Sequence, residues 1–172
     1  MGRSMSLFKR IKNIIKSPEP AKPEKTVLTL APGDMIEVSL VMYEVIGKTS
    51  MHSRNEMILT LQDGRTIRYL KIENRENTYY KLYAPIDGRL DSIDEIPTTI
   101  EMDDIKYHLE ERYDGRVVVM GKTPFAVSDE QYVWEFQSDN RKLLRVEWQD
   151  GRTMMYEGES ILSADVQIIR AT

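Results

Sequence analysis

The sequence predicts an all-β protein, built as an antiparallel sandwich or as paired small barrels from two similar halves, with a short N-terminal amphipathic helix. Beyond Val27, apolar and polar residues alternate with a period of two, as in Tyr132, Trp134 and Phe136, which is the period of a half-buried strand. The turn sequence Asp-Gly-Arg occurs four times, and Asp-Gly favours tight hairpin turns. The first 17 residues instead place their apolar side chains on one helical face.

The N-terminal residues 1–17 predict a helix that Pro18 ends. Its last dozen residues, 6–17, would span about 18 Å as a helix, too short to cross a bilayer, but an apolar face beside a lysine-rich face suits an anionic membrane surface or a groove on a protein partner. Docking on the body or on another subunit and a disordered tail are the alternatives. The predicted contact residues are Leu7, Phe8, Lys9, Arg10, Ile11, Lys12, Ile14, Ile15 and Lys16.

The rest of the chain divides by composition into four segments. Residues 18–26 contain three prolines and predict an extended linker. Residues 27–90 predict a first β unit, residues 91–104 an acidic connector, and residues 105–172 a second β unit.

Within these units the expected strands follow the alternating pattern, and the expected turns follow Asp-Gly and Asp-Asn. Hairpin turns are predicted at Asp63, Asp87, Asp114, Asp139 and Asp150. The expected strands are Val27–Ala31, Met35–Ile46 with a break in its middle, Met57–Gln62, Thr66–Glu73, Thr78–Tyr83, 105–110, Arg116–Met120, 132–137, 143–148, Thr153–Tyr156 and Asp165–Arg170.

An internal repeat is predicted from two pairs of similar segments. Tyr43–Thr49 and Arg116–Thr123 both end in Gly-Lys-Thr, and Met57–Glu73 resembles Val133–Glu147 in its strand–turn–strand pattern. Chance similarity between two hairpins is the alternative. Gly-Lys-Thr also ends a phosphate-binding loop, but the earlier glycine of that motif is missing, so we interpret both glycines as turn residues.

Composition and charge exclude several classes of function. The chain has 172 residues and no cysteine, which excludes disulfides and cysteine nucleophiles. Residues 1–25 carry a net charge of +5 and the remaining 147 residues a net charge of −9, so the body should repel nucleic acid. His52 and His108, the only histidines, are predicted to be surface residues. No catalytic residue, cofactor or metal ion is predicted.

Two further groups of residues are candidate sites. The acidic residues near the connector can attract a cation or a polyamine, although a solvated acidic connector is the default interpretation. Trp134 and Trp148 would form an interaction patch if exposed, whereas core packing is the alternative. The candidate cation-binding residues are Asp91, Asp94, Glu95, Glu101, Asp103 and Asp104.

The body resembles a known family. The segments Gly33–Ile36, Tyr43–Gly47, Leu59–Glu73 and Leu143–Gly151, with Tyr156–Gly158, are similar to the bacterial domain of unknown function 4178. The resemblance covers roughly residues 27–170. It implies a small, mostly β protein, often preceded by a basic amphipathic helix, and it implies a membrane or polyamine context without assigning catalytic residues.

Together these observations predict a non-enzymatic binding or adaptor protein in the cytoplasm. Its partner is expected to be a protein, and its N-terminal helix is expected to place it peripherally on the inner face of the membrane; a homo-oligomer is left open. The alternative is a module that binds a small polyamine-like cation, or an accessory subunit of a polyamine-modifying enzyme.

Overall fold

The computed structural model describes residues 26–87 and 96–170, and within them it confirms the all-β prediction. The predicted N-terminal helix lies outside the described residues, and within them no helix is long and apolar enough to cross a membrane. The elements in chain order are η1 (Val27–Thr29), β1 (Met35–Val38), β2 (Val41–Met51), η2 (His52–Arg54), β3 (Glu56–Asp63), β4 (Thr66–Asn74), β5 (Thr78–Ile86), β6 (Thr99–Met102), β7 (Ile105–Arg116), β8 (Val118–Gly121), β9 (Glu130–Ser138), β10 (Leu143–Gln149), β11 (Arg152–Ile161), η4 (Ser163–Asp165) and β12 (Val166–Arg170).

The strands form one open antiparallel sheet. Its twelve strands follow the order β12-β1-β2-β3-β4-β5-β11-β10-β9-β7-β6, with β8 paired to β2. The sequence predicts a sandwich or paired barrels, but the hydrogen bonding is continuous instead, because β11 pairs with β5 on one side and with β10 on the other. Alternation alone does not reveal which strands become neighbours, so it could not distinguish these arrangements.

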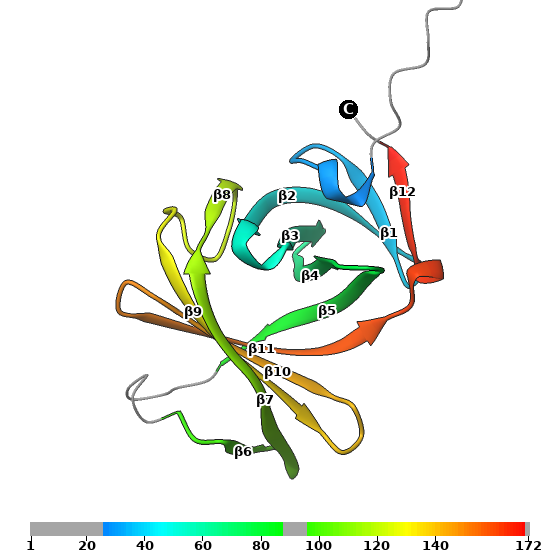
Figure 1. Cartoon of the computed structure of the whole chain (residues 1–172). Helices are drawn as coiled ribbons and strands as arrows, with labels where there is room; N and C mark the ends of the chain where they lie inside the picture. Colours follow the sequence, from blue (N-terminus) through cyan, green and yellow to red (C-terminus); the bar gives the residue numbers. More distant parts are fainter. Residues whose placement is uncertain (1–25, 88–95, 171–172) are drawn as a thin grey trace, which may run out of the picture.

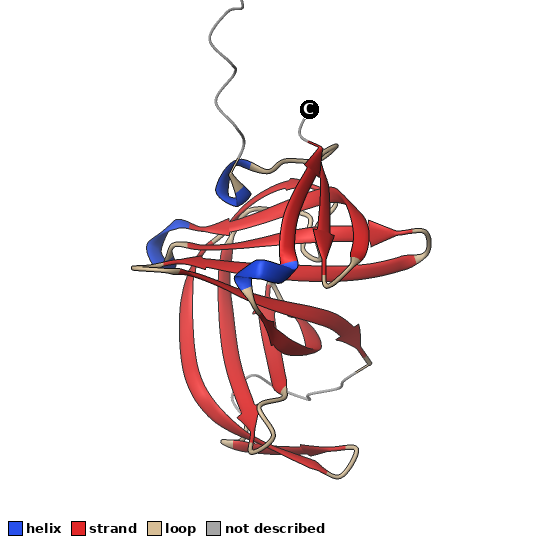
Figure 2. Ribbon diagram, turned by 90° about the vertical axis from the view of Figure 1, so that its right-hand side faces the viewer, coloured by secondary structure: helices blue, strands red, loops and turns tan. Residues whose placement is uncertain are grey.

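The sheet bends strongly, so that strands distant in its order come together. Strands β2 to β5 curve around an interior on one side, and β9 to β11 cross below it (Figure 1). Figure 2 shows the same sheet from the side as two sets of strands that run in different directions. Strand β8 follows β7 and pairs with β2, so the two parts meet a second time. The candidate site lies between these two parts, on the opposite face of β4 from the space that the curve encloses.

The glycines of the two Gly-Lys-Thr segments allow β2 and β8 to approach each other closely. Gly47 and Gly121 lie directly opposite each other in the β2–β8 pair, and the Lys122 N–H donates to the Ile46 carbonyl over 2.8 Å. A Cβ atom on Gly47 would lie only 1.8 Å from the Lys122 carbonyl oxygen. The glycines are therefore required for close backbone approach, and the interpretation of both as simple turn residues is wrong.

Most predicted turns are confirmed. Asp63, Asp139 and Asp150 lie in the connections of the β3–β4, β9–β10 and β10–β11 hairpins, and the expected break in Met35–Ile46 falls at Ser39 and Leu40, which have φ angles of 49° and 67°. The turn predicted at Asp87 involves residues outside the described ones.

Two local predictions are wrong. Asp114 does not begin a turn, because the chain continues as β7 in register with β9; Gly115 lets the Ser53 side chain pack against that strand, where a Cβ atom would be 2.8 Å from its hydroxyl oxygen. Val27–Thr29 is a 3-10 helix rather than a strand. Its ends are joined by hydrogen bonds between Thr26 and Thr29, a local pairing that competes with strand formation.

Apolar residues form two separate core clusters on the bent sheet. Leu59, Leu70 and Ile72 belong to a cluster enclosed by the curve of the first strands. Leu144 and Val146 belong to a second cluster on β10. Because side chains alternate along a strand, the intervening residues of β3, β4 and β10 point to the faces opposite these clusters.

The close approach at Gly47 gives a first prediction. Gly47→Ala should lower the free energy of unfolding by roughly 3 kcal/mol, because its Cβ would collide with backbone rather than with a flexible side chain. Gly64→Ala is the control: Gly64 has φ +59° but open space around it, so only about 1 kcal/mol of backbone strain is expected. Urea unfolding measures both, and equal losses would contradict the account.

Candidate functional site: a buried ionic cluster beside a tyrosine pocket

Charged side chains from four strands meet between the two parts of the bent sheet. Lys71 and Glu73 alternate with apolar residues on β4, and Arg145 and Glu147 do the same on β10, so each pair shares one face of its strand. All the members are at most 8% exposed. We call this set the ionic cluster: Glu56, Lys71, Glu73, Tyr113, Glu135, Arg145 and Glu147.

Lys71 lies at the centre of three carboxylates. Its ammonium nitrogen is 2.5 Å from Glu73, 2.5 Å from Glu135 and 3.3 Å from Glu56. These three glutamates have carboxylate oxygens within 4.8 Å of one another, the kind of arrangement that can hold a metal ion. The lysine ammonium already contacts all three, so an internal cation takes the place of a metal.

Arg145 makes the corresponding contacts from β10. Its guanidinium donates to Glu147 over 2.8 Å, to Glu135 over 2.7 Å and to Glu56 over 3.2 Å. It also donates to the Tyr113 hydroxyl oxygen over 2.9 Å, while that hydroxyl donates to Glu56. Glu56 and Glu135 are therefore shared by both buried cations, and they link β3 and β4 to β9 and β10.

The contacts keep the cluster ionised despite its burial. Burial alone raises the pKa of Glu135, but Arg145, Lys71 and Lys81 together lower it to about 2. Burial opposes the charge of Lys71 as well, yet Glu56 and Glu135 raise its pKa above the ordinary value. Mutual pairing is what makes buried charges tolerable in a low-dielectric interior.

The buried charges do not balance. Four carboxylates face only Lys71 and Arg145, and the two further cations that approach do so from the rim: Arg75 lies 2.8 Å from Glu73, and Lys81 lies 3.6 Å from Glu135. Within the described residues Glu147 forms an ion pair with Arg145 alone, and Arg145 is shared with two other carboxylates. Glu147 is therefore the carboxylate of the ionic cluster with the fewest cationic partners.

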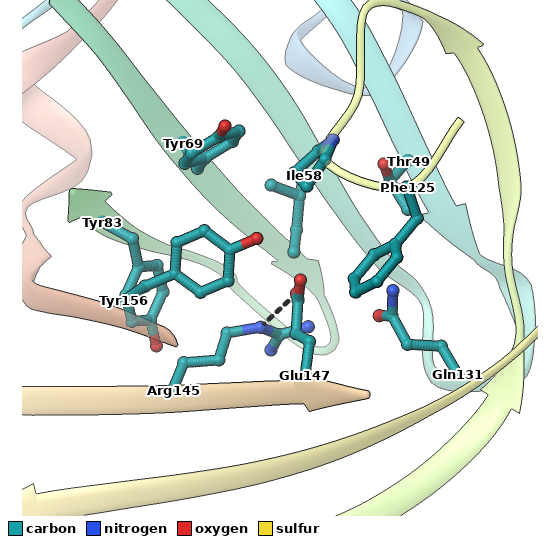
Figure 3. Close-up of a pocket in the computed structure, with 10 residues that line it drawn as sticks. Thr49, Ile58, Tyr69, Tyr83, Phe125, Gln131, Arg145, Glu147 and Tyr156 are labelled. Atoms are coloured by element: carbon teal, nitrogen blue, oxygen red, sulfur yellow. Dashed lines mark hydrogen bonds and ion pairs between the residues drawn. The ribbon is translucent and has the colours of Figure 1, made fainter. Parts of the chain in front are cut away.

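A small pocket lies on that side of the cluster. Figure 3 shows aromatic side chains from several strands around Glu147 and Arg145. The Tyr69 and Tyr156 rings are 5.2 Å apart, and those of Tyr83 and Tyr156 are 6.4 Å apart, both edge to face. We call this space the tyrosine pocket; its lining is Thr49, Ile58, Tyr69, Tyr83, Pro124, Phe125, Gln131, Arg145, Glu147 and Tyr156.

One buried polar group of the tyrosine pocket lacks a hydrogen-bond partner of normal geometry among the described residues. This group is the Tyr156 hydroxyl, which points toward the middle of the pocket (Figure 3). Burial raises the pKa of Tyr156 well above its ordinary value, and the nearby Glu147 carboxylate adds to this. The hydroxyl is therefore neutral and able to donate or accept.

The loop between β8 and β9 lines one side of the tyrosine pocket. Its Phe125 side chain is 5% exposed, and the loop is held by a 2.6 Å hydrogen bond from the Gln149 amide to the Val127 carbonyl. The space left open to the centre of a water molecule is about 10 Å³, which is about what one buried water requires. A larger group enters only if one or more of the lining side chains move.

The described residues that the sequence singled out as candidate sites lie outside the ionic cluster and the tyrosine pocket. The predicted helix contacts and Asp91, Asp94 and Glu95 lie outside the described residues, whereas Glu101, Asp103 and Asp104 are exposed at the β6–β7 hairpin. Trp134 is buried and Trp148 is half-buried against the second core cluster, which favours core packing for both. His52 and His108 are exposed.

Sequence reasoning missed the ionic cluster itself. It assigned Glu135, Arg145 and Glu147 to wet strand faces, because a polar residue in an alternating pattern is usually solvated. One signal was available: the order base, apolar residue, acid occurs in Lys71-Ile72-Glu73 and again in Arg145-Val146-Glu147, at matching positions of the predicted repeat.

The lowered pKa of Glu135 gives a pH prediction. A carboxylate whose pKa falls from 4.5 to about 2 on folding stabilises the folded state above pH 4.5, and this stabilisation is lost as the pH falls toward 2. Its contribution to the slope approaches 1.4 kcal/mol per pH unit. Glu135→Gln should remove that contribution, measured by urea unfolding between pH 2 and 7. Glu157→Gln, at an exposed carboxylate, should retain it; the same slope in all three proteins would disprove the assignment.

Comparison with known proteins gives the family. A family model described as Domain of unknown function (DUF4178) matches residues 31–163, a range that contains the whole ionic cluster and the whole tyrosine pocket. No curated protein and no solved structure matches the chain. The match confirms the resemblance of the strand and turn motifs, and the chain belongs to the DUF4178 family.

Proposed function

We propose that the protein is a non-enzymatic binding module that holds a small ligand in the tyrosine pocket. The observation that carries this proposal is the Tyr156 hydroxyl, which is buried in an aromatic pocket beside Glu147 and has no hydrogen-bond partner of normal geometry among the described residues. A buried polar group without a partner costs about 1–3 kcal/mol. A ligand that bonded to this hydroxyl would recover that free energy, which makes the cost a reason to infer binding.

The surroundings of the pocket favour binding over catalysis. The charged groups of the ionic cluster are paired with one another, and Glu56 and Lys71 are at most 5% exposed, so they are not free to exchange protons with a substrate. The pocket combines aromatic walls with a few polar groups, which is the usual composition of small-ligand sites. The role as accessory subunit of a polyamine-modifying enzyme, and the internal repeat, stay predictions.

The binding site can be tested with three four-carbon probes: n-butylammonium, 1-butanol and butyrate. We expect at least one to shift the amide resonances of the loop that carries Phe125 and of Thr49 in a proton–nitrogen correlation spectrum, because these residues line the pocket. Phe125→Ala should strengthen that binding, since it leaves the space of the ring empty. No response to any probe in either protein would rule the proposal out.

The same proposal predicts an unusual stability effect. Tyr156→Phe should raise the free energy of unfolding of the free protein by about 1 kcal/mol, because it removes the unpartnered hydroxyl, and it should weaken probe binding. Tyr79→Phe, at a 51% exposed tyrosine, is the matched control and should change neither. A less stable Tyr156→Phe protein would show that the hydroxyl is already bonded.

A second proposal is an adaptor role at a membrane or protein surface. It is favoured by the β1–β2 hairpin tip, where Leu40 is 91% exposed at a φ angle of 67° and Met42 is 51% exposed. A leucine in this conformation is unfavourable for folding, so its presence suggests a contact. The charge difference between the basic residues 1–25 and the acidic body supports a separate role for the N-terminal segment.

Liposome flotation tests the membrane part of this second proposal. The intact chain should float with anionic vesicles at low salt, because the segment 1–17 combines apolar and basic residues. Deletion of residues 1–17 should abolish flotation, and neutral vesicles are the control. Equal flotation of the intact and shortened chains would contradict a membrane role for this segment.

A further inference from the structure

We propose that the group that the tyrosine pocket binds is the primary ammonium head of a small amine. This inference rests on the proposed binding function, and it names the ligand class from the charge, the walls and the size of the pocket.

The charge of the site comes first. Lys71 and Arg145 together face four buried carboxylates, and the rim cations Arg75 and Lys81 contact Glu73 and Glu135 rather than Glu147. Among the described residues Glu147 has a single cationic partner, and that partner is shared by three carboxylates, whereas each of the other carboxylates of the ionic cluster has at least two cationic partners. A cation beside Glu147 would give this carboxylate a second partner, whereas an anionic or neutral ligand would not.

The walls of the pocket suit the same ligand. Tyr69, Tyr83 and Phe125 present aromatic rings around the space into which Tyr156 points. Aromatic faces attract organic cations, and the attraction grows when the site is desolvated. A hard metal ion would instead need about six oxygen ligands, and the three-carboxylate position that approaches this is already taken by Lys71.

Size and hydrogen bonding then select among cations. The open space holds one group about the size of a water molecule, which matches a primary ammonium and is too small for a quaternary one. An ammonium has three donors and no acceptor. The Glu147 carboxylate and the Tyr156 hydroxyl oxygen, which both point toward the middle of the pocket (Figure 3), supply acceptors for two of them. The alkyl part of the amine would lie against the Phe125 ring, which lines the pocket.

The test compares n-butylammonium with its neutral analogue 1-butanol by calorimetry and by amide shifts on the wild-type chain at low ionic strength. We expect n-butylammonium to bind at least about tenfold more tightly than 1-butanol and butyrate not to bind. Equal affinity for the alcohol, or tighter binding of butyrate, would overturn the ammonium assignment and leave the binding function standing. If none of the three probes produces heat or an amide shift, the proposed binding function itself is wrong.

A pair of variants tests whether Glu147 is the source of the preference for n-butylammonium over 1-butanol. Glu147→Gln should reduce the preference for n-butylammonium over 1-butanol to near unity, because it removes the carboxylate at the pocket. Glu157→Gln removes the same charge from an exposed position on β11 and should keep the tenfold preference. A preference that survives in Glu147→Gln, or disappears equally in both variants, would contradict the proposed position. If Glu147→Gln does not fold, the wild-type comparison alone still decides the ligand class.

Discussion

Two buried cations hold the interior of this protein together. Lys71 and Arg145 come from β4 and β10, and both contact Glu56 and Glu135, which come from β3 and β9. The bent sheet thereby gains a link between strands that are not hydrogen-bonded neighbours. Because buried charges are costly unless each has a partner, loss of one cation would leave two shared carboxylates undercompensated. The arrangement of the surrounding strands depends on this pairing.

The same pairing explains the character of the neighbouring pocket. The cluster brings four carboxylates to two buried cations, and Glu147 is the carboxylate with the fewest cationic partners among the described residues. Tyr156 lies beside that carboxylate, its hydroxyl has no hydrogen-bond partner of normal geometry among the described residues, and Phe125 lines the same pocket. A protein selected only for stability would replace such a tyrosine by phenylalanine; retention of the hydroxyl is the kind of local cost that binding sites carry.

Local features of the fold could be predicted from the sequence, and long-range ones could not. The Asp63 and Asp150 turns follow from two residues that tolerate a hairpin conformation, and strands such as 143–148 follow from alternation. Alternation assigned Arg145 and Glu147 to solvent, however, because it reports that two faces differ and not what covers the polar one. The need for glycine at positions 47 and 121 likewise becomes clear only from the pairing of β8 with β2, which brings the two backbones close together. The Tyr83–Tyr156 contact depends on the β5–β11 pairing, which no local pattern encodes.

The ionisation state of Lys71 is the most direct test of this account. Nuclear magnetic resonance of its side-chain nitrogen reports whether the group is an ammonium and how quickly its protons exchange with water. The account predicts a slowly exchanging ammonium at neutral pH that stays protonated above pH 10.5, because its pKa is raised by Glu56 and Glu135. A neutral amine, or an ammonium that exchanges as quickly as that of a surface lysine, would contradict it.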